Sequence, residues 1–234
     1  MVFYHKRKDE IMQSFSNHGD DKKMLKYLGH IDKGLFIEAG ANNGTEQSNT
    51  KLYESELGWT GLLVEPNIHK YKDCVKTRHN SKVENYALVS PSHGKDTIKG
   101  FFQSDDHGDS LCGRVVDTGY ESYKHDERWF GKGEPIEVPC ITLSELLVKH
   151  DIKGSDVHFF SLDIEGYEPY ALEGLDLTIN RPLYMLIEMD EGLHHQSFGS
   201  NWHFETLVKM LADHEYEFVE KISPIDALYR RREG

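Results

Sequence analysis

Residues 34–44 read GLFIEAGANNG, an apolar run that ends in a turn with two glycines. A continuous apolar segment of this length is typical of a buried strand. Gly40 and Gly44 allow the backbone to turn sharply and to approach a ligand closely. Glu38 stands at the end of the predicted strand, and ligands of open α/β sheets bind at the carboxyl ends of their strands. The stretch therefore predicts a strand and binding loop of an α/β fold.

A second buried strand is predicted at residues 61–66, GLLVEP, where Pro66 ends the run. Its last carboxylate, Glu65, follows the glycine turn by about twenty residues, a position from which an acid can bind both hydroxyls of a ribose. The glycine turn alone is common in proteins. Together with the acidic strand end, it indicates a nucleoside-binding sheet.

Strands and helices alternate along the rest of the chain. The pattern predicts strands at 83–89, 157–163 and 183–188, helices at 47–57, 69–77 and 168–173, a helix starting at the capping box of Thr142 and Glu145, an amphipathic helix around 204–211, and a closing strand pair at 216–219 and 227–229. Such alternation predicts a mainly parallel sheet with helices on both faces.

Residues 91–138 read as an irregular connector, rich in Gly, Asp, Ser and His. Connectors of this length are often lids or binding loops. We expect residues 104–110 to fold over a bound ligand. Four aromatic residues come after this segment. They either stack on a sugar or base or pack against the loop itself, and they are Tyr120, Tyr123, Trp129 and Phe130.

Charge, hydropathy and cysteine spacing exclude or disfavour several classes of protein. The 234 residues carry a net charge of -13, and their basic runs lie at residues 5–8 and 230–232, which makes binding of long nucleic acid less favourable. No apolar run reaches the ~20 residues of a membrane span, and no signal-peptide core follows the N-terminus. The spacing of the three cysteines fits neither a zinc site nor a disulfide framework. We expect a cytoplasmic protein with a helical extension at 1–30 and one domain at 31–234.

The glycine turn departs from the dinucleotide-binding fingerprint. It reads ExGxxxG instead of GxGxxG, and Asn42 takes the place of the middle glycine. A pyrophosphate approaches the backbone closely at that position and requires a residue without a side chain. A nucleoside that carries an amino-acid group depends less on such a close approach. The turn therefore favours S-adenosylmethionine over NAD as the cofactor.

Several motifs, taken together and in order, resemble the FkbM family of methyltransferases. They are residues 36–44, 48–50, 58–67, 138–146, 159–168 and 172–174. The resemblance implies a Rossmann-like class I methyltransferase fold, with a seven-stranded, mainly parallel sheet whose last strand is antiparallel. It also implies S-adenosylmethionine as methyl donor and a hydroxyl acceptor, often on a sugar or another small molecule. Family members often have lysine where Ser161 stands.

The expected cofactor site follows the strand ends. Glu38 and Gly40 are expected to shape the methionine end, Glu65 to bind the ribose, and Asp163 to lie beside the methyl group. The complete set of cofactor-binding candidates is Glu38, Gly40, Ala41, Asn42, Gly44, Glu65, Pro66, Asn67, Tyr86, Ala87 and Asp163, with Asn85 beside the adenine pair.

The catalytic candidates are Asp163, Glu165, Glu188 and His194, because transfer to an aliphatic hydroxyl requires a base for its proton. Residues 188–195 read EMDEGLHH, and close carboxylates and imidazoles can bind a divalent metal. Asp163, Glu188 and His194 are the metal candidates, although the segment also reads as a polar loop.

Four functions compete on this evidence, and one of them, an NAD-dependent enzyme, is disfavoured by the missing middle glycine of the turn. Of the other three, the first is O-methylation of a glycan or small-molecule acceptor. The second is methylation of RNA at a ribose 2'-hydroxyl or 3' end, which the net charge disfavours. The third is a catalytically silent binding protein, which the joint presence of Glu38, Glu65 and Asp163 disfavours.

Overall fold

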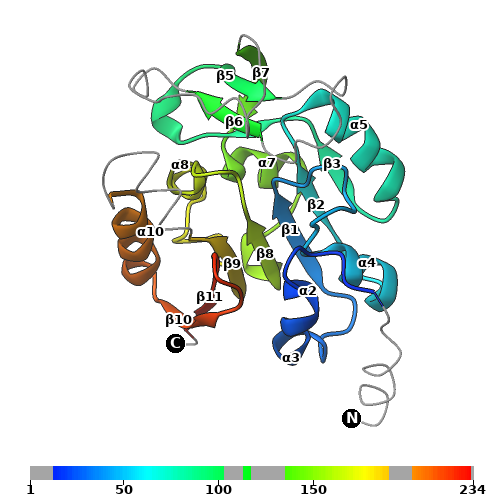
Figure 1. Ribbon diagram of the computed structural model, residues 1–234. Coiled ribbons are helices and arrows are strands. Elements are labelled where there is room, and N and C mark those ends of the chain that lie inside the picture. Colours follow the sequence, from blue (N-terminus) through cyan, green and yellow to red (C-terminus); the bar gives the residue numbers. More distant parts are fainter. Residues whose placement is uncertain (1–12, 103–112, 117–134, 190–201, 233–234) are drawn as a thin grey trace.

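The computed structural model describes residues 13–102, 113–116, 135–189 and 202–232 (Figure 1). Its centre is a seven-stranded sheet in the order β10-β11-β9-β8-β1-β2-β3. The bounds are β1 Leu35–Ala39, β2 Thr60–Val64, β3 Lys82–Glu84, β8 Phe159–Leu162, β9 Tyr184–Glu188, β10 Tyr216–Lys221 and β11 Asp226–Arg231. The strands from β9 to β3 run parallel, and β11 is antiparallel to both its neighbours. The predicted Rossmann-like class I fold is thus confirmed.

The central strands are buried on both faces, which explains their continuous apolar runs. Successive residues of β1 point to opposite sides, as in any strand. Ile37 belongs to one core cluster, with Leu172 and Leu207, and Phe36 belongs to another, with Leu52 and Leu28.

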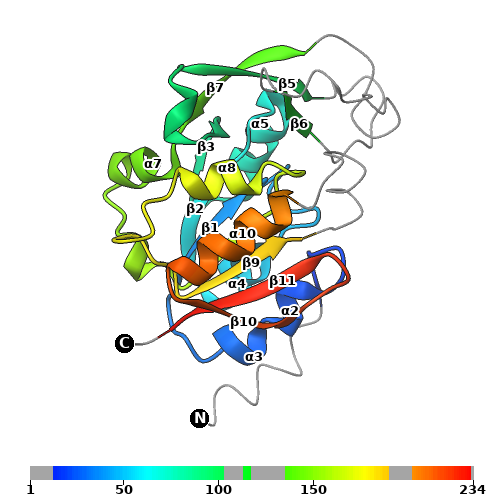
Figure 2. The same cartoon turned by 90° about the vertical axis from the view of Figure 1, so that its left-hand side faces the viewer.

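Helices cover both faces of the sheet (Figures 1 and 2). One face holds α7 Leu143–Lys149, α8 Glu168–Glu173 and α10 Trp202–Asp213, and the other holds α2 Asp20–Lys23, α3 Leu25–Leu28, α4 Lys51–Leu57 and α5 Ile68–Thr77. Of the two short N-terminal helices, α3 contributes Leu25 and Leu28 to the core, and Met24 between the helices is buried with them. None of the helices in the described ranges is long and apolar enough to span a bilayer.

The ends of these helices follow local sequence signals. The predicted capping box is present, because the Thr142 side chain accepts from the Glu145 amide and the Glu145 carboxylate accepts from the Thr142 amide. Gly58 ends α4 in the left-handed conformation, with φ 66°. Asn67 caps α5 by accepting from the His69 amide.

The chain between β3 and β8 corrects two predictions. The strand predicted at 83–89 is broken into β3 and β4 Ala87–Leu88, and the second part joins another sheet. That four-stranded sheet has the order β4-β7-β5-β6, with β5 Thr97–Phe102, β6 Gly113–Val116 and β7 Ile136–Ile141, so the region 91–138 is not irregular throughout. It lies at the carboxyl end of the parallel strands (Figure 1).

The strands of the four-stranded sheet were not predicted, and the reasons are physical. The break after β3 is held by Asn85, whose amide donates to the carbonyls of Glu65 and Pro66. Gly100 in β5 and Pro139 in β7 are poor strand formers, so local pattern hides these strands. They form because they pair with partners distant in sequence, such as Thr97 with Pro139.

Candidate active site

Four carboxylates lie at the carboxyl ends of adjacent strands, as predicted. Glu38 is in β1, Glu65 follows β2, Asp163 follows β8, and Glu188 ends β9. The strand order places all four along one edge of the sheet. This edge faces the second sheet (Figure 1), so the site lies where an open α/β fold binds its ligands.

Gly40 brings the ends of β1 and β8 into contact. Its φ is +82°, and a Cβ atom built on it would lie 1.8 Å from the carbonyl oxygen of Asp163. The Asp163 amide donates to the Ala39 carbonyl at 3.2 Å. Any side chain at position 40 would therefore push the Asp163 backbone away from the turn.

We expect Gly40→Ala to lower the free energy of unfolding by more than the ~1–3 kcal/mol of a strained backbone alone, because the added carbon also clashes with Asp163. Gly58→Ala is the matched control, since Gly58 has φ +66° and nothing within 4 Å of the added carbon. Urea unfolding and titration with S-adenosylmethionine check both variants. Equal losses of stability and affinity in the two would contradict the role given to Gly40.

The turn after β1 is tied to β2 by its backbone. The amides of Gly40 and Ala41 donate to the Val64 carbonyl, and the Gly44 amide donates back to Ala41. Asn42 has φ 48° and donates its amide to Glu65 Oε2 at 2.8 Å. The side-chain oxygen of Asn42 is buried and has no hydrogen-bond partner within the described residues. A buried acceptor of this kind suits a ligand that donates.

Glu65 is buried, and each of its carboxylate oxygens accepts one backbone amide. Asn42 donates to Oε2 and Asn67 donates to Oε1, both at 2.8 Å. Burial raises the pKa of Glu65 to about 7, against the two amides and Lys70, which lower it. A carboxylate oxygen can accept more than one hydrogen bond, so two further donors can be bound.

The remaining candidates for cofactor binding differ in their burial and in their contacts. Pro66 is half-buried and Asn67 is committed to capping α5. Tyr86 is half-buried under the ammonium group of Lys149, 4.9 Å from its ring centroid. Ala87 is buried in the core of the second sheet. Asn85 reaches the end of β2 through its side chain.

Glu38 is fully engaged inside the protein. Its carboxylate accepts from the hydroxyls of Ser48 and Thr50, the amide of Asn49, and the guanidinium of Arg78. It therefore shapes the neighbouring turn by holding residues 48–50 in place.

Arg78 is the residue of this network that the sequence did not reveal. It is 0% exposed and joins Glu38 at 3.1 Å and Glu54 in a closer contact. It also donates to the Gly44 carbonyl at 3.2 Å and the Thr50 hydroxyl at 2.8 Å. Since one cation bridges two buried carboxylates and the turn, the network stiffens the loop 40–50.

Asp163, Glu168 and Glu188 form a carboxyl cluster at the ends of β8 and β9. Leu162 pairs with Ile187, so Asp163 follows beside Glu188. Asp163 is half-buried, whereas Glu168 and Glu188 are buried. Glu165 lies in the turn after Asp163 with φ 60°. Asp163 is thus the member of the cluster that a ligand can reach.

The three carboxyls have raised pKa values. Burial raises the pKa of Asp163, opposed by a hydrogen bond with Glu188. Burial and the charges of Asp163, Glu168, Glu165 and Asp226 raise the pKa of Glu188 well above its usual range. Burial, with a further contribution from Asp163, raises the pKa of Glu168 to about 8. The charge of Asp163 thus contributes to the raised pKa values of both buried neighbours, and the three groups do not ionise independently.

Comparison with known families identifies this arrangement. A family model described as the methyltransferase FkbM domain matches residues 38–218, from the end of β1 into β10. The chain belongs to the FkbM methyltransferase family. It is accordingly an S-adenosylmethionine-dependent methyltransferase, as the motifs indicated.

Solved structures show distant likeness to this FkbM methyltransferase. The fibrillarin/Nop5p complex has 10% identity, covers 93% of this chain and 81% of its own, and gives a TM-score of 0.48. Aeropyrum pernix fibrillarin with natively bound S-adenosyl-L-methionine has 14% identity, coverages of 88% and 70%, and a TM-score of 0.46. A TehB-like SAM-dependent methyltransferase from Corynebacterium glutamicum has 8% identity, coverages of 99% and 96%, and a TM-score of 0.47. No match was found among curated proteins.

The residues of this FkbM methyltransferase fit the methyl donor. The buried, unpartnered side-chain oxygen of Asn42 and the acceptor capacity left on Glu65 suit a nucleoside that donates hydrogen bonds. Both groups lie on the loops that follow β1 and β2.

The metal proposed from the sequence gains no support. Among the described residues, no group of three or more His, Cys, Asp and Glu side chains is arranged to hold a metal ion. His194 lies outside the described residues, as do residues 104–110 and the aromatic candidates Tyr120, Tyr123, Trp129 and Phe130.

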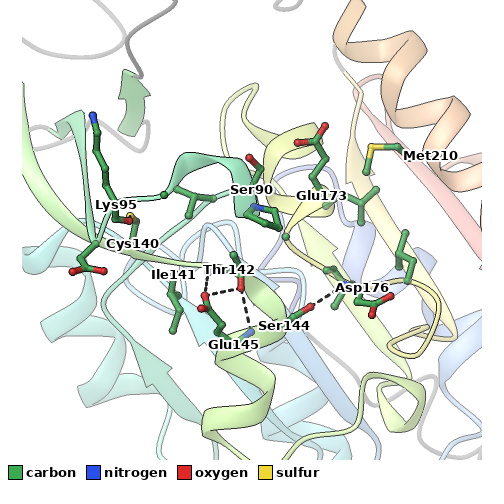
Figure 3. Close-up of a pocket in the computed structure, with 18 of the residues that line it drawn as sticks. Ser90, Lys95, Cys140, Ile141, Thr142, Ser144, Glu145, Glu173, Asp176 and Met210 are labelled. Atoms are coloured by element: carbon green, nitrogen blue, oxygen red, sulfur yellow. Dashed lines mark hydrogen bonds between the residues drawn. The ribbon is translucent and has the colours of Figure 1, made fainter.

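A cavity of about 780 Å³ lies between the segment after β4 and the helices α7, α8 and α10 (Figure 3). Ser90 and Lys95 come from the segment after β4, Thr142 precedes α7, Glu173 ends α8, and Met210 comes from α10. Glu168 begins α8, so the cavity and the carboxyl cluster lie at opposite ends of that helix.

Proposed function

We propose that this enzyme methylates a hydroxyl group of a sugar or another small molecule. In this proposal the turn 40–44 and Glu65 hold S-adenosylmethionine, with Tyr86 and Ala87 on the adenine side. The observation that carries it is Asp163, whose backbone packs against Gly40 of the turn and whose half-buried carboxylate lies beside two buried acids. A proton acceptor beside the donor site is what an aliphatic hydroxyl acceptor requires.

The side chains have separate tasks in this mechanism. When bound, S-adenosylmethionine supplies a methyl group whose bond to sulfur breaks as the acceptor oxygen bonds to the carbon, the electron pair remaining on sulfur. Asp163 takes the proton that the hydroxyl loses. Because Asp163 is half-buried, it can return that proton to solvent. Glu38 and Arg78 keep the donor loop in the geometry that in-line transfer needs.

Charge supports a small acceptor over RNA. The net charge of -13 and the carboxylates along the binding edge repel phosphate groups. An uncharged glycan or small hydroxylated molecule meets no such repulsion.

The proposal is tested in two stages. Titration calorimetry with S-adenosylmethionine and with its demethylated product measures donor binding. Methyl-labelled S-adenosylmethionine is then offered with hydroxylated sugars, other small alcohols and RNA in parallel. Transfer to a sugar or small alcohol supports the proposal, while transfer to RNA alone overturns the acceptor class. Absence of donor binding would leave the silent binding protein as the better reading.

The affinity for S-adenosylmethionine is expected to rise with pH. Ribose hydroxyls donate hydrogen bonds, which favour the ionised form of Glu65, and the pKa of Glu65 is about 7. The ionised fraction, and with it the association constant, then increases about tenfold from pH 6 to pH 8. Calorimetry across this range checks the slope. Glu65→Gln is the control, and a slope unchanged in that variant would assign the effect to another group.

The Glu65 carboxyl also makes the stability of the protein without ligand depend on pH. This stability is expected to fall as pH rises, whereas the affinity for S-adenosylmethionine rises. The pKa of Glu65 in the folded state lies above its ordinary value, so folding takes up a proton. The stability that this proton uptake contributes is complete below the ordinary pKa and is lost as pH rises through about 7. Bound S-adenosylmethionine should offset that loss.

A further inference from the structure

Three acidic residues lie side by side at the carboxyl edge of the sheet, one on each of three adjacent strands. Glu188 ends β9 and pairs with Asp226, the first residue of β11. On the other side, β9 pairs with β8 in a register that places Asp163, the residue after β8, beside Glu188. Neighbouring strands are about 4.8 Å apart, so the three charges act on one another. We call these residues the carboxyl row. Glu188 and Asp226 are each 6% exposed, whereas Asp163 is half-buried and accessible.

No cation of the described residues compensates the carboxyl row. Within 13–102, 113–116, 135–189 and 202–232, no lysine, arginine or histidine forms an ion pair with any of its members. Lys23, which contacts the turn before β11 through the Ile222 carbonyl, is paired with Asp20. Burial of uncompensated carboxylates is unfavourable, so the row favours a ligand that brings a positive charge.

Two buried acceptors without partners lie at the same place. Glu168 is 0% exposed, and its Oε1 accepts two amides of the turn that follows Asp163, but its Oε2 has no hydrogen-bond partner among the described residues. Its charge acts on Glu188, so it belongs to the same acidic site. The other acceptor is Oδ1 of Asn42, in the turn whose Gly40 packs against the Asp163 backbone. Because buried polar atoms are nearly always paired, both acceptors indicate a ligand with positive or hydrogen-bond-donating groups.

We propose that the carboxyl row selects the methyl donor by its charge, attracting the positive sulfonium of S-adenosylmethionine but not the neutral sulfur of the demethylated product. This inference rests on the donor site of the proposed function, in which Asp163 lies beside the methyl group. Glu188 is the specificity-determining residue, since it is the middle member of the row and adjoins both of the others. A cleft lined by one sign of charge concentrates its field on a ligand of the opposite sign.

Charge stays balanced through the transfer. The acceptor oxygen bonds to the methyl carbon as the bond from that carbon to sulfur breaks, and the electron pair of the broken bond stays on sulfur. The hydroxyl proton moves to Asp163. One positive charge is lost at sulfur and one arrives at the carboxyl row, so the attraction for the donor ends when the methyl group has left. Product release follows from the same charges that bind the donor.

Calorimetry with three ligands tests the proposal. They are S-adenosylmethionine, its demethylated product, and sinefungin, in which a carbon bearing an ammonium group takes the place of the sulfonium. We expect the wild type to bind the two positive ligands at least about tenfold more tightly than the neutral product. The three ligands carry the same ribose, so ionisation of Glu65 does not alter this ratio.

Glu188→Gln tests the assigned residue. Glutamine has nearly the same shape but no charge, so the affinity for S-adenosylmethionine should fall by about three- to tenfold, while the affinity for the product should stay within about twofold. The matched control is Glu173→Gln, which removes the same charge from an exposed position at the end of α8. It should leave both affinities unchanged.

Two results overturn the proposal. One is a wild type that binds the neutral product as tightly as the positive ligands, a comparison that requires no variant to fold. The other is an unchanged ratio of affinities in Glu188→Gln, whether both affinities fall together or neither does. Either result leaves the proposed function intact. If none of the three ligands binds, the donor site fails, and the proposed function fails with it.

Discussion

Replacing Arg78 with methionine is expected to lower the free energy of unfolding by about 3–5 kcal/mol, because it leaves buried carboxylates without their cation. Glu38 and Glu54 are 3% exposed and both contact Arg78. Methionine has a similar length, so little of the loss comes from a cavity. Urea unfolding measures the change.

The control for Arg78 is an exposed arginine in an ion pair. Arg230 pairs with Glu217 and is half exposed, so Arg230→Met should cost no more than about 1 kcal/mol. Adding Glu54→Gln to Arg78→Met should restore part of the stability by removing one stranded charge. Similar costs for the two single variants would show that the buried network contributes little.

Replacing Asp163 with asparagine is expected to lower kcat by about 10²–10⁴-fold, the usual contribution of a general base. Asparagine has nearly the same shape and cannot take the proton. The dissociation constant for S-adenosylmethionine should change by less than about tenfold, or 1.4 kcal/mol. Single-turnover rates with the acceptor found in the screen, together with calorimetry, separate the two effects.

The matched control for Asp163 is Asp176→Asn, which removes an exposed carboxylate after α8. It should leave kcat unchanged. In the wild type, the rate should rise with pH as Asp163 ionises, because burial raises the pKa of that carboxyl. Wild-type turnover by Asp163→Asn would remove this residue from the mechanism.

The strand ends were predictable because their signals are local. Apolar runs that stop at an acid or a glycine identify Glu38, Glu65, Asp163 and Glu188 without knowledge of the fold. Parallel topology then brings them to one edge. The cap at Thr142 was predictable for the same reason, since both partners lie within one helical turn.

The buried network and the second sheet depend on contacts distant in sequence. Arg78 follows α5 and meets Glu54, 24 residues away, so the sequence shows only an arginine after a helix. Glu168 lies in a quoted motif, yet nothing local separates it from a solvated acid. The available signal was an acid in front of Pro169, at the first position of a helix.

The pairing of β4 with β7 holds together the two ends of the segment that forms the second sheet. Leu88 lies beside Ile141, so the chain leaves and rejoins the Rossmann core at one place. An excursion closed at its base can change length or sequence while the layer beneath it keeps its register, since a longer closed loop costs little extra entropy. The second sheet is therefore the part of the fold in which a change of loop length is expected to leave the strands beneath it in register.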